Sequence, residues 1–339
     1  MWFSSPANYA QTVSNGRWQM ANHLALIDKV TTRLIYDHNL PIDKARPTLP
    51  RILIIEAPPR HGKSEYISKY LPSWYLSLFP HKRVILTSYG KDLSRNFGRF
   101  VKDQITHYGP KYFGINVKTD HSAASDWDIA TLNGTSLGGM LSAGIGGSIT
   151  GFGAHLFIID DFCKNAEEAL SPKLRDKWWD TFQTTLQTRM EPNGIIILIA
   201  TRWHNDDLVG RLTGESDKDY EWNEPYIRLQ LPALAIETEL DNPFLARRHN
   251  LSQLKSHLSR KNIQGFSLGN LSDQAYLNHL LARKPGDPLW PERHTKKILD
   301  STKSNLDNYW WQSLYMQNPG RSDRAEWPDH YFENIFAEV

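Results

Sequence analysis

The chain has 339 residues, 39 Lys and Arg against 37 Asp and Glu, and one cysteine. This length suffices for about two domains or one large α/β domain. The near-neutral charge excludes binding of nucleic acid through a global field, and a single cysteine excludes an internal disulfide. No apolar run approaches the ~20 residues of a membrane helix, and we expect no signal peptide, because no basic segment precedes an apolar one.

The first 50 residues are expected to form a helical lead-in. Apolar residues at helical spacing predict an amphipathic helix from Arg17 to Tyr36, followed by three prolines before the first strand. Gln11, Trp18 and Gln19 are either contacts for an adenine ring or ordinary surface and core positions of this lead-in.

A phosphate-binding loop follows the first predicted strand. Residues 51–55 are mainly apolar and predict a buried parallel strand, and residues 65–78 have helical spacing. Between them lies APPRHGKS (57–64), in which Lys63 would neutralise the β- and γ-phosphates and Ser64 would bind Mg²⁺. Ala57 replaces the usual first glycine, and a chance Gly-Lys-Ser turn is the alternative. The expected nucleotide contacts are Pro59, Arg60, His61, Gly62, Lys63, Ser64 and Glu65.

The next predicted elements are a strand over residues 83–88 and a helix over residues 91–108. Arg95 and Arg99 lie four residues apart in this helix, hence on one face. Their face is either solvated or approaches phosphates. Residues 109–154 are rich in glycine and predict a hairpin that turns at Asn133-Gly134.

Two carboxylates follow the apolar run of residues 156–159. This run predicts a buried strand that brings Asp160 and Asp161 to its carboxyl end, where ligands of open α/β sheets bind. We expect Asp160 to hold Mg²⁺ and Asp161 to orient or deprotonate the attacking water. A solvated pair of aspartates is the alternative.

A third apolar strand, residues 195–200, follows a predicted amphipathic helix from Ser171 to Met190. Thr201 comes directly after the strand and can hydrogen-bond a phosphate or the catalytic water. Arg202 and His204 can reach phosphate or carboxylate, but no second His or Cys has ligand spacing with His204.

The remaining chain is less patterned. Residues 226–231 predict one more strand, residues 282–297 are rich in turns, and residues 306–317 predict a helix. Residues 237–281 read as a basic insertion or small subdomain that either contacts DNA phosphates or presents a solvated face. Its candidate DNA contacts are Arg247, Arg248, Lys255, Arg260 and Lys261.

Together these motifs resemble one family, the large subunit of double-stranded DNA phage terminases, the genome-packaging motor. The resemblance spans nearly the whole chain from about residue 50. It is carried by PPRHGKSE (58–65), LTSYGKDLSRNFGRFVKD (86–103), GSITGFGAHLFIIDD (147–161), LIATRWHNDDLVGRL (198–212), PGDPLWPER (285–293) and WWQSLYMQNP (310–319).

The resemblance implies the ATPase half of the enzyme, an α/β P-loop NTPase of the ASCE type with a mainly parallel sheet flanked by helices. Thr201 starts the motif that couples hydrolysis to movement, and Arg60 matches an arginine within the phosphate loop that senses the γ-phosphate. The other matched positions are Lys63 and Ser64 in the Walker A loop, Asp160 in Walker B, and Asp161 at the catalytic acid.

The domain organisation that follows has four parts. Residues 1–50 are the lead-in, 51–236 the P-loop ATPase core, 237–281 the basic insertion, and 282–339 the C-terminal part of the ATPase domain with the start of a linker. Residues 237–339 show no strand-borne acid cluster, so we expect no nuclease activity. The chain would be a motor domain cut from a longer protein or a natural split form.

The implied function is Mg²⁺-dependent ATP hydrolysis that moves double-stranded DNA into a procapsid in the host cytoplasm. The implied partners are the portal, the small terminase subunit, a nuclease domain or subunit, and further copies in a ring, with no membrane. Phe152 stands where related sequences often have an arginine, so Arg99 and Arg95 are the candidate trans arginine fingers.

Two other functions remain open at this point. One is another DNA-dependent P-loop ATPase, such as a helicase-like enzyme, and the other is a nucleotide-binding clamp that does not hydrolyse. The acid pair argues against the clamp, and the lack of an arginine-rich lid at the expected place argues against a nucleotide kinase.

Overall fold

The computed structural model describes residues 3–39, 50–147, 149, 151–218, 220, 222, 224–236 and 281–320. Residues 237–280 of the predicted basic insertion lie outside these ranges, as do the last 19 residues, 321–339. The candidate DNA contacts Arg247, Arg248, Lys255, Arg260 and Lys261 therefore stay untested predictions. No helix of the described ranges combines the length and the apolar character that crossing a membrane requires.

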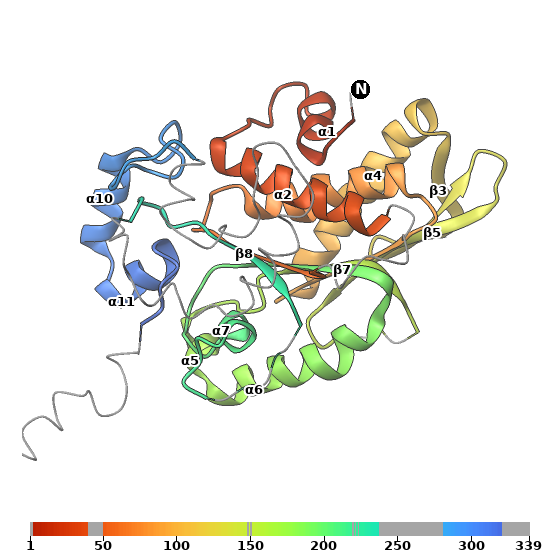
Figure 1. Ribbon diagram of the computed structural model, residues 1–339. Helices are drawn as coiled ribbons and strands as arrows, with labels where there is room; N and C mark the ends of the chain where they lie inside the picture. Colours follow the sequence, from red (N-terminus) through yellow and green to blue (C-terminus); the bar gives the residue numbers. More distant parts are fainter. Residues whose placement is uncertain are drawn as a thin grey trace, which may run out of the picture.

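One sheet organises the described residues (Figure 1). Its eight strands have the order β3-β4-β5-β2-β6-β7-β1-β8. Neighbours from β5 through β8 in this order are parallel, whereas β3 and β4 extend one edge as antiparallel strands. The predicted α/β class with a mainly parallel sheet is thus confirmed. The bounds are β1 Ile52–Glu56, β2 Arg83–Ser88, β3 Ile115–Ser122, β4 Asp126–Thr131, β5 Ser136–Gly144, β6 Ala154–Asp160, β7 Met190–Ala200 and β8 Tyr226–Gln230.

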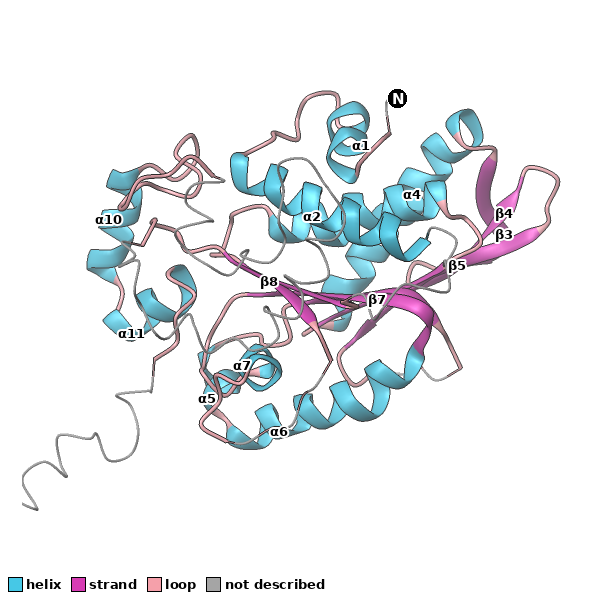
Figure 2. Ribbon diagram, in the orientation of Figure 1, coloured by secondary structure: helices cyan, strands magenta, loops and turns pink. Residues whose placement is uncertain are grey.

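Helices cover both faces of this sheet (Figure 2). One face carries α1, α2, α3 and α4, and the other carries α5, α6 and α7, while α10 and α11 lie beyond the strand ends (Figure 1). The bounds are α1 Pro6–Val13, α2 Asn22–Asn39, η1 Glu65–Tyr70, α3 Leu71–Leu78, α4 Lys91–Tyr112, α5 Ala166–Leu170, α6 Pro172–Thr181, η2 Phe182–Leu186, η3 Gln187–Arg189, α7 Leu208–Thr213, α10 Lys296–Asn305, α11 Asn308–Trp310 and η6 Trp311–Tyr315.

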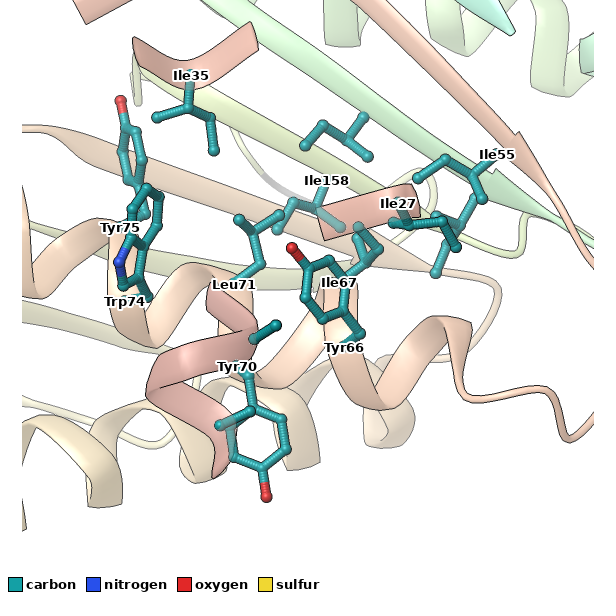
Figure 3. Packing of buried hydrophobic residues seen from close by; sticks show 14 of the residues in the cluster. Ile27, Ile35, Ile55, Tyr66, Ile67, Tyr70, Leu71, Trp74, Tyr75 and Ile158 are labelled. Carbon is teal, nitrogen blue, oxygen red and sulfur yellow. The ribbon is translucent and has the colours of Figure 1, made fainter. Parts of the chain in front are cut away.

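Alternate side chains of the central strands enter two separate cores. In β1, Leu53 and Ile55 pack with α1 to α4, whereas Ile52 and Ile54 pack with α5 to α7. The first core includes Ile67, Leu71 and Trp74 of η1 and α3, which lie against the sheet (Figure 3). Because both faces are covered, these strands contain uninterrupted apolar runs, which is why they were predictable from composition.

The helical lead-in differs from its prediction in where the helices begin. A first helix, α1, ends before Asn15 and Gly16, whose φ angles are 52° and 77°. These left-handed residues interrupt the helix, so α2 begins at Asn22 rather than at Arg17. Trp18 lies between the two helices and packs near Tyr66, with ring centroids 6.2 Å apart.

The predicted boundaries of three further elements, one strand and two helical segments, were wrong. β7 begins at Met190, five residues before the predicted start, because Asn193 at φ 61° is a bulge within the strand and not its boundary. The predicted helix over residues 306–317 is shorter and consists of α11 and η6. α10 occupies residues predicted partly as turns and begins with Thr295 as its N-cap.

Candidate active site

Three predicted site segments meet at one edge of the sheet. β6, β7 and β1 are parallel neighbours, and Glu56 of β1 is in register with Ala200 of β7. Asp160 at the end of β6 is in register with Ile199. The phosphate loop after β1, the acid pair after β6 and Thr201 after β7 therefore lie side by side, at the edge where open α/β sheets bind ligands.

The backbone of the phosphate loop is set by two left-handed residues. Arg60 has a φ of 64° and Gly62 a φ of 83°. A Cβ atom at Gly62 would lie 3.3 Å from Leu24 Cδ1 and 3.5 Å from Trp290 Cζ3. Both the φ angle and the close neighbours favour glycine here. The chain then turns directly into η1 and α3, so the loop ends at a helix N-terminus.

Lys63 links the loop to the two neighbouring strands. Its side chain is nearly buried, and Nζ donates a hydrogen bond to Thr201 Oγ1 at 2.6 Å. The same nitrogen lies 3.5 Å from Asp161 Oδ2. Lys63, Thr201 and Asp161 thus form one contact group at the carboxyl edge, although they come from three different segments.

Asp160 faces the hydroxyl groups of two serines. Its Oδ1 accepts a hydrogen bond from Ser64 Oγ at 2.9 Å, and its Oδ2 accepts one from Ser68 Oγ. Burial, followed by the charge of Asp161, raises the pKa of Asp160 to about 7. A hydroxyl next to a buried carboxylate is a donor set that suits Mg²⁺, and a cation there would favour the ionised carboxylate. The residues present therefore fit the expected ion.

The predicted role of Ser64 as a Mg²⁺ ligand can be tested through the Mg²⁺ dependence of the expected ATP hydrolysis. We expect Ser64→Ala to raise the Mg²⁺ concentration that gives half-maximal ATP hydrolysis by about tenfold, because it removes one oxygen next to Asp160. The measurement is a Mg²⁺ titration at saturating ATP. Ser304→Ala, at an exposed helix position, should leave the titration unchanged. An unaltered midpoint for Ser64→Ala would exclude this serine as a ligand.

Asp161 is held in an unusual backbone conformation. Its φ is 46°, and its N–H donates to Ile199 O while its C=O accepts from Tyr89 N. Its Oδ1 accepts a hydrogen bond from the Thr201 N–H at 2.7 Å. Left-handed φ is uncommon for residues other than glycine, so these contacts compensate for strain that sets the direction of the carboxylate.

A cavity of about 630 Å³ lies beside the loop. Its walls come from segments far apart in the sequence: the residues before α2 and its first turn, the loop itself, η1, α4 and the stretch before α10. They are Arg17, Trp18, Gln19, Leu24, Arg60, Gly62, Lys63, Ser64, Glu65, Tyr70, Phe100, Trp290 and Arg293. Of the three residues considered for an adenine ring, Trp18 and Gln19 line this cavity and Gln11 does not.

Two residues expected to contact the nucleotide do not line this cavity. Pro59 and His61 are absent from its walls, and the His61 side chain is fully buried. The ring of His61 stacks on that of His294, with centroids 4.2 Å apart, and its Nδ1 donates to Pro59 O. Burial lowers the pKa of His61 to about 3, so this imidazole is neutral at pH 7.

The candidate trans fingers lie on the surface of α4. Arg95 and Arg99 are both exposed, and neither has an ion-pair partner within the described residues. Phe152, at the position where related sequences often have arginine, packs against the core formed with α5 to α7. Exposure leaves both arginines available to another subunit, and the finger itself stays a prediction.

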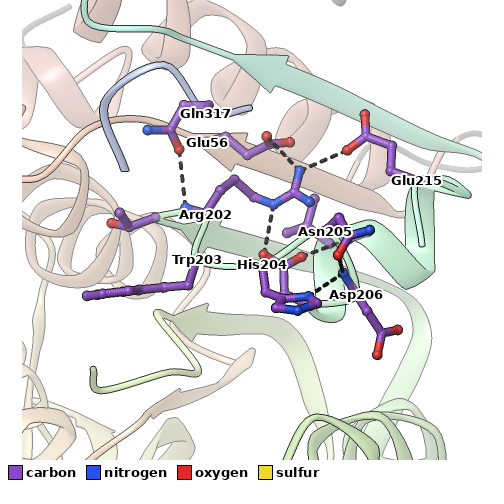
Figure 4. Close-up of polar contacts among 12 residues, drawn as sticks. Glu56, Arg202, Trp203, His204, Asn205, Asp206, Glu215 and Gln317 are labelled. Carbon is purple, nitrogen blue, oxygen red and sulfur yellow. Dashed lines mark hydrogen bonds and ion pairs between the residues drawn. The ribbon is translucent and has the colours of Figure 1, made fainter. Parts of the chain in front are cut away.

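A buried ion network connects the strand ends behind the site (Figure 4). Arg202 is fully buried and donates to Asp207 Oδ2 at 2.8 Å, Glu56 Oε2 at 3.3 Å and Glu215 Oε2 at 2.9 Å. Arg228 of β8 also pairs with Glu56 and Glu215. Arg202 thus reaches carboxylates of this chain, one of the two roles predicted for it.

Sequence reasoning missed several members of the site. Arg17, Tyr70, Phe100, Trp290 and Arg293 line the cavity but carry no local phosphate-loop pattern. The sequence LWPER (289–293) was noted as part of a motif, yet nothing in its spacing placed it against residues 60–62. Only the packing of segments that are distant in sequence brings these residues together around the loop.

One edge of this sheet carries a glycine-lysine-serine loop, two acids and a threonine. This arrangement defines an α/β protein of the P-loop class. A protein-family model described as terminase large subunit, T4-like virus type, N-terminal, matches residues 54–307. Because that match spans well over half of the chain, the chain belongs to the phage terminase large subunit family. Comparison with curated proteins found no match.

Among solved structures, the bacteriophage HK97 large terminase matches with a TM-score of 0.47 and 11% sequence identity. The match covers 86% of this chain and 50% of the HK97 chain. This chain therefore spans about half the length of that protein.

Proposed function

We propose that this chain is the ATP-hydrolysing motor domain of a terminase large subunit, which moves double-stranded DNA into a procapsid. The observation that carries the proposal is the contact group at the sheet edge. Lys63 Nζ bonds Thr201 at 2.6 Å and lies 3.5 Å from Asp161, and Ser64 bonds Asp160 at 2.9 Å. A protein that only binds a nucleotide has no need of the second acid.

The chemistry follows from what each group can do. The loop amides and Lys63 bind the β- and γ-phosphates, and Lys63 offsets the charge that develops on them. Ser64 and Asp160 hold Mg²⁺, which supplies further positive charge at the phosphate oxygens when bound. Asp161 orients the attacking water or accepts its proton. Arg60 lines the cavity, and we assign it the sensing of the γ-phosphate in the same subunit.

Coupling of hydrolysis to movement would begin at Thr201. Its hydroxyl accepts from Lys63 and its N–H donates to Asp161, so loss of the γ-phosphate changes both neighbours at once. The next two residues contact the C-terminal elements: Arg202 N–H donates to Gln317 Oε1 at 3.4 Å, and Trp203 O accepts from Tyr309 at 2.9 Å. Movement of Thr201 would therefore reach the segment that follows α10.

The partners we propose are duplex DNA, a portal, a small terminase subunit, a nuclease domain or subunit, and copies of this chain in a ring. The proposed location is the host cytoplasm. Family membership supports a role in packaging phage DNA. The exposed Arg95 and Arg99 on α4 support completion of the site by a neighbouring subunit.

Steady-state ATP hydrolysis with and without linear duplex DNA tests this function. We expect Mg²⁺-dependent turnover that increases with DNA and a specific activity that rises with protein concentration, because a neighbour supplies an arginine. ATP binding without turnover at any protein or DNA concentration would instead favour a nucleotide-binding clamp. Strand separation by the chain alone would favour a helicase-like enzyme.

A further inference from the structure

The stretch Leu289–His294, which lies far from the phosphate loop in the sequence, packs directly onto it. Trp290 Cζ3 would lie 3.5 Å from a Cβ at Gly62. His294 Nε2 donates a hydrogen bond to Arg60 O at 3.2 Å. The imidazole rings of His294 and His61 stack at 4.2 Å, with an angle of 18° between their planes. These contacts fix the stretch next to the loop.

Arg293 belongs to this stretch and lines the same cavity as Lys63 and Ser64. Its guanidinium lies 5.3 Å from the centroid of the Trp290 ring, which limits the directions the side chain can take. Within the described residues, no carboxylate lies within ion-pair distance of this guanidinium. Arg293 therefore faces the cavity with its charge uncompensated by the described protein.

The cavity as a whole has an excess of positive charge. Arg17, Arg60, Lys63 and Arg293 line it, and the single acid among its walls is Glu65. Glu65 is already paired with Lys69 at 2.6 Å. Lys63 itself lies 3.5 Å from Asp161, so the excess charge comes from the three arginines, which have no ion-pair partner among the described residues. Such a space suits a polyanion, and the guanidinium fork matches phosphate oxygens in a bidentate way.

We propose that Arg293 binds the phosphates of a nucleoside di- or triphosphate in this cavity, so that a residue near α10 completes the site formed by the loop. This inference rests on the proposed nucleotide-binding function and adds a binding residue to it. Trp290 and His294 position Arg293, since they hold its segment against Gly62 and Arg60.

Equilibrium binding of a slowly hydrolysed ATP analogue, ADP and adenosine tests the assignment. We expect Arg293→Ala to weaken binding of the analogue and of ADP about tenfold or more, which corresponds to about 1.4 kcal/mol, without changing the affinity for adenosine. Arg293→Lys should give an intermediate loss, because it keeps the charge but not the fork. Lys297→Ala removes an exposed charge outside the cavity and should bind as the wild type does.

The outcomes separate this inference from the proposed function. Unchanged affinity of Arg293→Ala for both phosphorylated ligands, with Lys63→Ala impaired, would overturn the role of Arg293 alone. An equal loss of adenosine affinity would also overturn it, because the residue would then act on the base or the fold. Failure of the wild type to bind any nucleotide would contradict the proposed function itself.

Discussion

Replacing Asp161 with asparagine should lower ATP turnover about a thousandfold while ATP affinity stays within about threefold. General acid–base groups contribute about 10²–10⁴-fold to rates, and an amide cannot accept the proton of the attacking water. Asparagine keeps an oxygen that can accept from Thr201 N, the contact that Asp161 Oδ1 makes at 2.7 Å. The substitution should therefore abolish most ATP hydrolysis while the local structure is kept.

This prediction is measured as single-turnover hydrolysis together with equilibrium binding of ATP. Asp92→Asn, at an exposed position in the first turn of α4, is the matched control and should hydrolyse ATP at the wild-type rate. If Asp161→Asn kept a rate within a few-fold of the wild type, Asp161 could not be the group that activates water.

Removal of the Arg228 side chain should destabilise the fold by about 3–5 kcal/mol. Arg228 and Glu56 are both buried, and Arg228, in the middle of β8, pairs with Glu56 at the end of β1 and with Glu215 after α7. In Arg228→Ala, the fully buried Glu56 loses one of its two arginine partners and keeps only the longer contact with Arg202, at 3.3 Å. A buried carboxylate that loses compensating charge carries a large desolvation cost.

Urea unfolding followed by tryptophan fluorescence measures this loss. Arg99→Ala removes an exposed arginine and should change the free energy of unfolding by less than about 0.5 kcal/mol. The double variant Glu56→Gln, Arg228→Met should lose less stability than Arg228→Ala, because it removes one charge of each sign. A loss below about 1 kcal/mol for Arg228→Ala would show that the network contributes little.

The predicted parts of the fold are those in which local pattern and burial agree. β1, β6 and the end of β7 are continuous apolar runs because helices cover both faces of the sheet, so composition alone located them. β3 was missed because most of its residues are only partly buried, and its sequence INVKTDHS alternates apolar and polar residues over its first four positions only. α1 is short and depends on the Ser5 cap and on Asp28, which accepts from Ala7 N at 2.8 Å.

The residues of the candidate site also fall into a group that the sequence predicted and a group that it did not. Asp160, Asp161 and Thr201 lie at or directly after strand ends, and Lys63 and Ser64 end the loop that follows β1. The position of ligand sites at the carboxyl edge of parallel sheets therefore sufficed to predict that these residues lie together. The other cavity walls come from packing between segments that share no sequence pattern. Nothing local indicates that Trp290 contacts the phosphate loop, or that Arg202, which follows β7, and Arg228 of β8 share Glu56.

The most direct test of the account is release of inorganic phosphate from Mg²⁺-ATP by the wild-type chain, at high protein concentration and with linear duplex DNA. Lys63→Ala serves as the blank, because it removes the amine that bonds Thr201 at 2.6 Å and lies 3.5 Å from Asp161. We predict turnover in the wild type and none above background in Lys63→Ala. Equal phosphate release by the two proteins would contradict the assignment of this site as an ATPase.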